Sequence, residues 1–186
     1  MARFVQGKII RRFRLRGRKV VFRYPKTNDL DDMFSHVNRL VEEKAYIFVQ
    51  KKRTRTQHKK HFEEIFKNIR KGDEVRVCVE VDGKYAGLSS VKRKYGDARK
   101  HMVILAITLG KDFRDMGIGT ELLKTMEQLA KKELGARIVE LSYLQFNERS
   151  KHLYKKLGYR EVGRIPNGIN YYGKFCDEIL MVKVLK

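Results

Sequence analysis

One short stretch near the middle of the chain combines a cation with two glycines in a spacing that suits an anion. Arg114 precedes Gly117 and Gly119, an apolar run at 101–109 comes just before, and a helical pattern follows. A helix N-terminus exposes unpaired N–H groups and the positive end of the helix dipole, where phosphate binds readily. Glycine lets an anion approach the backbone, and arginine adds a charge-assisted donor. The stretch has the parts of a pyrophosphate site, although a tight turn without a ligand also fits the glycines.

Two other phosphate-binding motifs do not fit this stretch. The dinucleotide fingerprint requires a third glycine where Leu122 stands. The phosphate loop of nucleotide hydrolases ends in Gly-Lys-Ser/Thr, whereas Gly119 is followed by Thr120 and Glu121. Both nucleotide-binding classes are therefore excluded on spacing.

The elements that would position this turn alternate between strands and helices. Hydrophobic periodicity and turn signals predict strands within 8–25, helices at about 28–41 and 62–69, and a hairpin of strands around Asp82-Gly83. The later elements are strands at 101–109 and 136–144, helices at 118–134 and 147–158, strands at 159–165 and 177–185, and a loop at 166–176 between the last two. This order predicts a mixed α/β domain with a largely antiparallel sheet.

A second stretch, residues 147–163, strengthens the interpretation of the first. Its spaced residues are Asn147, Ser150, Leu153, Tyr154, Lys156, Gly158 and Tyr159. Together with Arg114-x-x-Gly117-x-Gly119 and the strand order, it resembles the GCN5-related N-acetyltransferase (GNAT) superfamily. The resemblance covers most of the chain, from about residue 19 to the end. It implies the acyl-CoA N-acyltransferase fold, with a mostly antiparallel twisted sheet flanked by helices and splayed between its fourth and fifth strands.

The resemblance implies acetyl-CoA as the co-substrate of an acyltransferase. The pantetheine arm would enter the gap between the strands at 101–109 and 137–144, and would pair with the backbone near Ile107 and Leu109. Asn147, which also suits a helix cap, would reach the same arm. The pyrophosphate would lie on the backbone amides of Arg114, Asp115, Met116, Gly117, Ile118, Gly119 and Thr120.

The same resemblance makes Tyr154 the general acid, which would protonate the departing thiolate when an amine attacks the thioester. Neither Cys78 nor Cys176 lies in a recognised motif, so we expect direct transfer in a ternary complex. The general base is open, because residues 100–109 contain no carboxylate where many relatives have a glutamate. The candidates are His101, Glu80, Glu140, Asp177, Glu178 or a water relay.

The acyl acceptor is also open: a protein N-terminus, a lysine side chain or a small amine. By analogy with the fold, the segment 165–177 lies near the acceptor mouth. Its polar and aromatic residues are Asn167, Asn170, Tyr171 and Tyr172.

The composition sets further bounds. The chain has 186 residues, of which 42% are hydrophobic and 35% charged, enough for one domain with its own core. No apolar run is long enough to span a bilayer and no secretory signal is recognisable, so we expect a cytoplasmic protein. His58 and His61 form an H-x-x-H within a basic stretch, which favours a solvated helix face over a metal site.

The formal net charge of +21 indicates a possible polyanionic partner. Residues 1–26 hold ten Lys or Arg and no acid, and a second basic stretch covers 51–61. We expect a basic arm or extra strand at 1–18 and the acetyltransferase domain at 19–186. The alternative function is docking on nucleic acid or a ribosomal complex through this arm, with binding as the main role. An ordinary charged surface also explains the excess, and a homodimer is possible.

Overall fold

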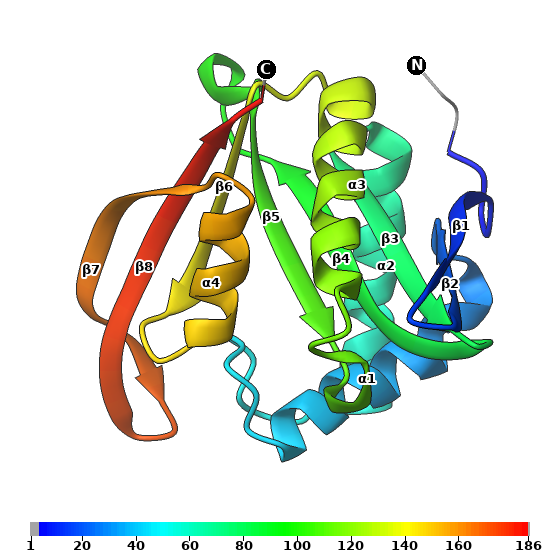
Figure 1. Cartoon of the computed structure of the whole chain (residues 1–186), viewed down its shortest axis with the longest axis horizontal. Coiled ribbons are helices and arrows are strands. Elements are labelled where there is room, and N and C mark those ends of the chain that lie inside the picture. Colours follow the sequence, from blue (N-terminus) through cyan, green and yellow to red (C-terminus); the bar gives the residue numbers. More distant parts are fainter. Residues whose placement is uncertain (1–3, 186) are drawn as a thin grey trace.

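A computed structural model describes residues 4–185, and the order of elements predicted from the sequence is confirmed (Figure 1). The strands are β1 (Ile9–Leu15), β2 (Arg18–Arg23), β3 (Glu74–Val81), β4 (Lys84–Arg93), β5 (Met102–Leu109), β6 (Ile138–Leu144), β7 (Arg160–Tyr171) and β8 (Lys174–Val184). The α-helices are α1 (Leu30–Glu42), α2 (Arg55–Lys71), α3 (Ile118–Leu134) and α4 (Glu148–Lys156).

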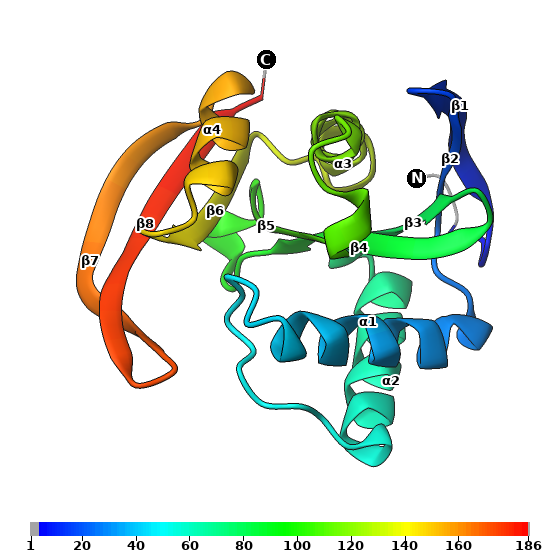
Figure 2. The same ribbon diagram turned by 60° about the horizontal axis from the view of Figure 1, so that its bottom comes forward.

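All eight strands belong to one sheet in the order β1-β2-β3-β4-β5-β6-β8-β7. Neighbouring strands are antiparallel except β5 and β6, which run parallel. Helices α3 and α4 cover one face of the sheet, and α1 and α2 cover the other (Figure 2). The mixed α/β fold class is confirmed, and residues expected as an arm or extra strand form β1 at the sheet edge.

The sheet splays open between β5 and β6. These strands pair only from Met102–Ile138 to Ile104–Glu140, although β5 continues to Leu109 and β6 to Leu144. Below the last pair the two strands diverge in the view of Figure 1, where α4 lies beside β6 and β5 is visible between α4 and α3. The splay lies between the two strands for which the sequence predicted it.

Helix α3 is anchored by its apolar stripe. Leu122, Leu123 and Met126 are fully buried against the sheet in the main core, as expected for a helix with apolar residues at intervals of three and four. The helix ends at Gly135, whose φ of +60° suits a left-handed C-cap. The core therefore fixes the position of the helix whose N-terminus forms the candidate phosphate site.

Two local expectations were wrong. The segment 166–176 is not a loop, because β7 and β8 extend through it and pair as far as Tyr171–Lys174. The turn signal at Pro166-Asn167-Gly168 produces a shift in strand register instead of a turn. His58 does not lie on a solvated helix face, since it is 1% exposed beside the Phe34 ring.

Gly87 generates a prediction about stability. Its φ is +153°, and a Cβ at this position would lie 2.2 Å from the Thr108 carbonyl oxygen on β5. We expect Gly87→Ala to lower the free energy of unfolding by at least about 2 kcal/mol, because the strand that borders the splay must move. Urea denaturation measures the change. The control is Gly163→Ala, where the nearest atom to the new Cβ is 3.6 Å away. Equal stability of the two variants would contradict the prediction.

Candidate active site

The turn before α3 leaves consecutive backbone N–H groups unpaired. The Arg114 N–H donates to Lys111 at 3.3 Å, and the Thr120 N–H donates to Gly117 at 3.1 Å. Between them, the N–H groups of residues 115–119 have no acceptor among the described residues. Such a run of free amides at a helix N-terminus suits an anion. We call residues 115–119 the amide cradle.

Left-handed backbone conformations shape the amide cradle. Asp115 has a φ of +60° and Gly117 a φ of +88°. Glycine adopts this region without strain, and aspartate is one of the residues that tolerate it. The alternation turns successive N–H groups to one side, so the cradle exists before any ligand binds.

Arg114 holds the turn in place and does not reach over the cradle. Its Nε donates to the Leu109 carbonyl at 2.8 Å, and its guanidinium forms an ion pair with Glu43 at the end of α1. The sequence indicated this side chain as a donor to an anion, but in the structure it donates to β5 and to the end of α1. The backbone amides remain as the donors available to an anion.

The edge of β5 that faces the splay also has backbone groups without partners among the described residues, although the Leu109 carbonyl accepts from Arg114. The Gly110 N–H donates to Ala86 on β4 at 2.9 Å. Because alternate residues of a strand direct their backbone groups to opposite edges, Leu105, Ile107 and Leu109 face away from β4. Ile107 and Leu109 lie beyond the last β5–β6 pair, so no strand pairs with them on that side within the described residues. This edge can therefore accept an extended, amide-bearing ligand, as expected for Ile107 and Leu109.

The two sequence stretches meet at the open end of the splay. A Cβ at Gly119 would lie 3.3 Å from a Leu153 methyl group and within 4.0 Å of Ile107 and Leu109. The gap is therefore narrow at this point, and a larger residue would compete with a ligand.

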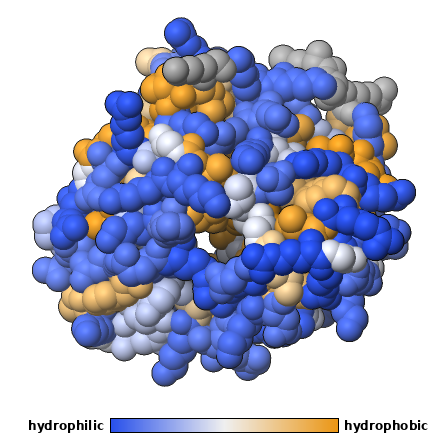
Figure 3. All heavy atoms as spheres, viewed as in Figure 1, coloured by the Kyte–Doolittle hydropathy of each residue, from blue (hydrophilic) through white to orange (hydrophobic). Residues whose placement is uncertain are grey.

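An ion pair and an opening mark the same region. Asp115 and Arg149 form an ion pair of 2.9 Å, which joins the start of α3 to the start of α4. The space-filling view shows an opening in the middle of this face, at the place where α4 and β5 separate (Figure 3).

Tyr154 lies on α4 and is 5% exposed. Its ring contacts the rings of Tyr143 and Tyr159, each at a centroid distance of 5.9 Å. Burial raises the pKa of Tyr154 to about 12, while a hydrogen bond with Ser150 opposes the increase. The phenol therefore keeps its proton throughout the physiological pH range.

Asn147 caps α4. Its side-chain oxygen accepts a hydrogen bond from the Ser150 N–H at 3.1 Å. An N-cap uses only the carbonyl of the amide, so the NH₂ group is still available to a ligand. The capping role is observed, and the contact with pantetheine stays a prediction.

Two of the candidate bases lie away from the open half of the splay. Glu80 on β3 accepts a hydrogen bond of 2.6 Å from Arg23. His101 immediately precedes β5 at its paired end, where its carbonyl accepts from the Arg137 N–H at 2.8 Å. Their positions disfavour both as proton acceptors for an amine in the gap.

The remaining candidates are closer, but most of them have partners. Glu140 holds the Lys94 ammonium at 2.8 Å. Asp177 accepts from the Asn167 N–H at 2.9 Å and also pairs with an arginine of β7. Glu178 differs, because its carboxylate has no hydrogen bond or ion pair with any described residue.

The α1–α2 connection, residues 43–54, is tied to the end of the β7–β8 hairpin. Gln50 donates to the Asn170 carbonyl at 2.5 Å and accepts from the Tyr172 N–H at 2.8 Å. The Tyr171 hydroxyl donates to the Lys44 carbonyl, and the Tyr172 hydroxyl bonds α1. We call these contacts the clamp. The clamp places the aromatic residues expected at the acceptor mouth across the end of the splay that is lower in Figure 1.

The clamp includes residues that the sequence analysis missed. Gln50 and Tyr46, which packs on Tyr171 at 5.4 Å, belong to a connection with no recognisable motif. Their only signal was polar and aromatic composition between two predicted helices. Sequence position alone could not indicate that this connection crosses to the C-terminal hairpin.

The basic β1–β2 hairpin packs beside the amide cradle. Arg11 pairs with Glu121 of α3 at 2.7 Å, and the Arg18 guanidinium lies 5.5 Å from the Phe113 ring centre. Arg18 also pairs with Asp82 at 2.8 Å. Part of the basic charge therefore supports the turn, while contact with a polyanion stays a prediction.

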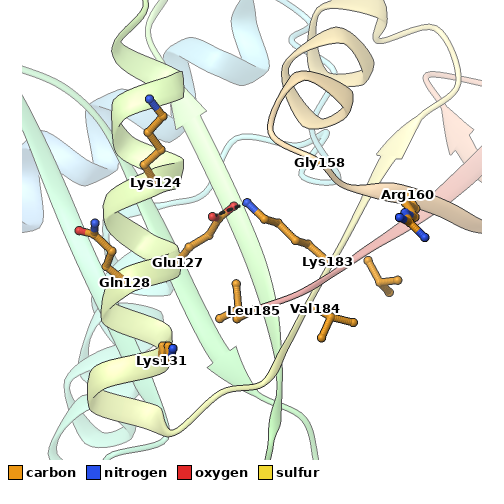
Figure 4. Close-up of a pocket in the computed structure, with 10 residues that line it drawn as sticks. Lys124, Glu127, Gln128, Lys131, Gly158, Arg160, Lys183, Val184 and Leu185 are labelled. Carbon is orange, nitrogen blue, oxygen red and sulfur yellow. Dashed lines mark hydrogen bonds and ion pairs between the residues drawn. The ribbon is translucent and has the colours of Figure 1, made fainter.

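A groove of about 650 Å³ separates α3 from the C-terminal part of β8 (Figure 4). Lys183 and Glu127 form an ion pair of 2.6 Å across it. Val182, Val184 and Leu185 form its apolar wall. The ion pair ties α3 to β8 and thus connects the two sides of the splayed sheet.

Three features together define a protein class: a splayed sheet, a cradle of free amides at a helix N-terminus, and a buried tyrosine on the opposite wall. They fit an enzyme that binds a ligand with both a phosphate group and an extended amide-bearing arm. The model of the acetyltransferase (GNAT) family matches residues 41–159, more than half of the chain. The chain belongs to this family, and the acetyltransferase class predicted from the sequence is confirmed.

Individual relatives agree with this assignment. An N-alpha-acetyltransferase of Sulfurisphaera tokodaii is 27% identical over 182 residues, which cover 91% of this chain and 96% of the relative. An uncharacterized N-acetyltransferase of Methanocaldococcus jannaschii is 32% identical over 104 residues, or 56% of this chain. That match spans 62% of the relative, less than two thirds of its length.

A solved structure shows the same fold. The phosphinothricin acetyltransferase of Sinorhizobium meliloti, solved with acetyl-CoA, matches with a TM-score of 0.78 and 19% identity. The match covers 89% of this chain and 88% of that one. Acetyl-CoA as the co-substrate is consistent with the family and with the free amides described above. No helix among residues 4–185 is long and apolar enough to cross a membrane.

The amide cradle generates a prediction about acetyl-CoA affinity. Gly119→Glu should weaken binding of acetyl-CoA at least about 10-fold, because it places a carboxylate beside the expected pyrophosphate. Titration calorimetry measures the dissociation constant. Gly119→Gln has nearly the same volume without the charge, so the difference between the variants isolates electrostatic repulsion. Equal affinity of both folded variants would contradict a pyrophosphate at this turn.

Proposed function

We propose that this protein transfers the acetyl group of acetyl-CoA to the α-amino group of a protein or peptide N-terminus. The observation that carries the choice of acceptor is the absence of a carboxylate on β5, residues 102–109. An N-terminal amine has a pKa of about 8 and a lysine side chain about 10.4. An N-terminus therefore loses its proton near neutral pH with far less assistance from a base.

The comparison with the Sulfurisphaera tokodaii protein supports this acceptor. That relative is an N-alpha-acetyltransferase, and the match covers nearly the full length of both chains. Docking on nucleic acid as the main role has no comparable support.

Different residues of the chain bind acetyl-CoA, align it and donate the proton to the leaving group. Bound acetyl-CoA supplies the thioester carbon and the thiolate leaving group. The amide cradle holds the phosphate end, and the free edge at Ile107 aligns the arm within the splay. Tyr154 holds its proton on a buried phenol, where it can donate to the departing sulfur. Asn147 fixes the start of α4, on which this tyrosine lies.

The acceptor can be tested with matched peptides. One peptide has a free N-terminus and no lysine, the second has a blocked N-terminus and one lysine, and a small polyamine is the third acceptor. At pH 7.5 we expect kcat/KM for the first to exceed that for the second at least about 10-fold, as the larger neutral fraction of its amine requires. Mass spectrometry identifies the acetylated nitrogen. Preferential acetylation of the lysine or the polyamine would refute the proposed acceptor.

Tyr154 generates a prediction about turnover. Tyr154→Phe keeps the buried ring and removes the proton, so kcat should fall roughly 10- to 10,000-fold with little change in acetyl-CoA affinity. Because burial raises the pKa of this phenol to about 12, its ionisation should not reduce wild-type activity below about pH 11. The control is Tyr143→Phe, which changes a neighbouring buried ring. Near-normal turnover of Tyr154→Phe would remove this residue from the mechanism.

A further inference from the structure

Alternation along the strands places Glu178 on the face of the sheet opposite α3 and α4. Lys183 of β8 pairs with Glu127 of α3, so the odd-numbered residues around it face that helix. Ile179 and Met181 are buried in the core with α3, in agreement. Glu178 therefore points to the side of α1 and its connection to α2.

Strand register places Glu178 at the level of the gap. The last β5–β6 pair is Ile104–Glu140. Four residues further along, β5 reaches Thr108 and β6 reaches Leu144, on opposite sides of the splay. Leu144 pairs directly with Glu178 on β8. The backbone of Glu178 is thus one strand spacing, about 4.8 Å, beyond β6, which forms this wall of the gap, and a glutamate side chain is long enough to span that distance.

The surroundings of Glu178 suit a cation. The fully buried Leu144 and the buried Cys176 belong to an apolar cluster beside it. Glu178 is half-buried, and no described residue neutralises it. A carboxylate at such a partly apolar site attracts an ammonium more strongly than one in open water. Other charged or titratable groups toward this face include Glu140 with Lys94, His36 bonded to Thr108, Arg39 and the Arg114–Glu43 pair near His36, and Lys44 and Tyr171 of the clamp.

We propose that Glu178 receives the amino group of the acceptor on this face and takes the proton that the amine loses before attack. The proposal rests on the acetyl transfer and acceptor proposed above. It assigns the two substrates to opposite faces, with acetyl-CoA on the side of α3 and α4 and the amine on the side of α1. The free backbone edge of β5 lies between them.

The protons and bonds balance in this arrangement. The acceptor ammonium gives one proton to Glu178. The lone pair that this leaves on the nitrogen forms the C–N bond with the thioester carbon. The C–S bond breaks, and the thiolate takes the phenolic proton of Tyr154. The second proton of the nitrogen restores that phenol through water, and Glu178 releases its proton to solvent. The products are the acetylated amine, coenzyme A thiol and one proton.

The test compares Glu178→Gln with wild type, using whichever of the three acceptor classes the wild-type enzyme acetylates. At pH 7.5, kcat/KM for the acceptor should fall about 100-fold. The loss should become smaller as the pH rises toward the pKa of the acceptor amine, because the amine then loses its proton without a base. The acetyl-CoA dissociation constant should not change, which also verifies folding. Glu178→Asp, which keeps the charge, should recover part of the activity.

The control is Glu140→Gln, which removes the other carboxylate of this face. Glu140 is already occupied by Lys94, so this change should alter kcat/KM less than about 5-fold. Near-wild-type activity of Glu178→Gln at pH 7.5, or the same loss at every pH, would overturn the proposal. The acceptor panel with wild-type enzyme tests the proposed function separately, because variant and wild type are compared on the same amine, whichever amine that is.

Discussion

The separation of β6 from β5 after the pair Ile104–Glu140 is the constraint on which the site depends. Two strands that diverge leave backbone N–H and C=O groups without partners, which is costly wherever water is excluded. Ile107 and the N–H of Leu109 are on such an edge, while the Leu109 carbonyl accepts from Arg114. An extended ligand that offers its own amides can satisfy these groups, so the same defect that weakens the sheet creates a binding surface.

The structure keeps this gap open by bracing both of its walls. On one side, Arg114 ties the turn before α3 to the Leu109 carbonyl and to Glu43 of α1. On the other side, Glu127 and Lys183 connect α3 with β8 above the gap, and the clamp joins the β7–β8 hairpin to the α1–α2 connection below it. The contacts on both ends limit how far the walls can approach each other. A gap held in this way needs little reorganisation when a ligand enters.

The sequence predicted the fold well because its elements are encoded locally. Alternating valines in β3 and the buried stripe of α3 define a strand and a helix without knowledge of their partners. The segment 166–176 failed for the opposite reason. Its turn residues, among them Asn167 with a φ of +53°, are accommodated within two paired strands, and only the pairing with β8 shows that.

The candidate site was predicted in outline and not in its polar detail. The glycine turn and Tyr154 follow from short spacings, which a sequence displays directly. The choice among Glu80, Glu140 and Glu178 does not, because it depends on which carboxylates have a cation beside them. The clamp joins residues more than a hundred positions apart, so its existence is a property of the folded chain.

The burial of the two cysteines bears on whether an acyl-enzyme forms. A covalent intermediate needs a nucleophile that reaches the thioester, and the two cysteines are the obvious sulfur nucleophiles. Cys78 is fully buried on β3, and burial raises the pKa of its thiol to about 12. Cys176 is 1% exposed, and its thiol pKa is also raised by burial. Neither thiol is ionised or accessible near neutral pH. The two buried thiols therefore give no support to an acyl-enzyme, in agreement with the proposed direct transfer with both substrates bound.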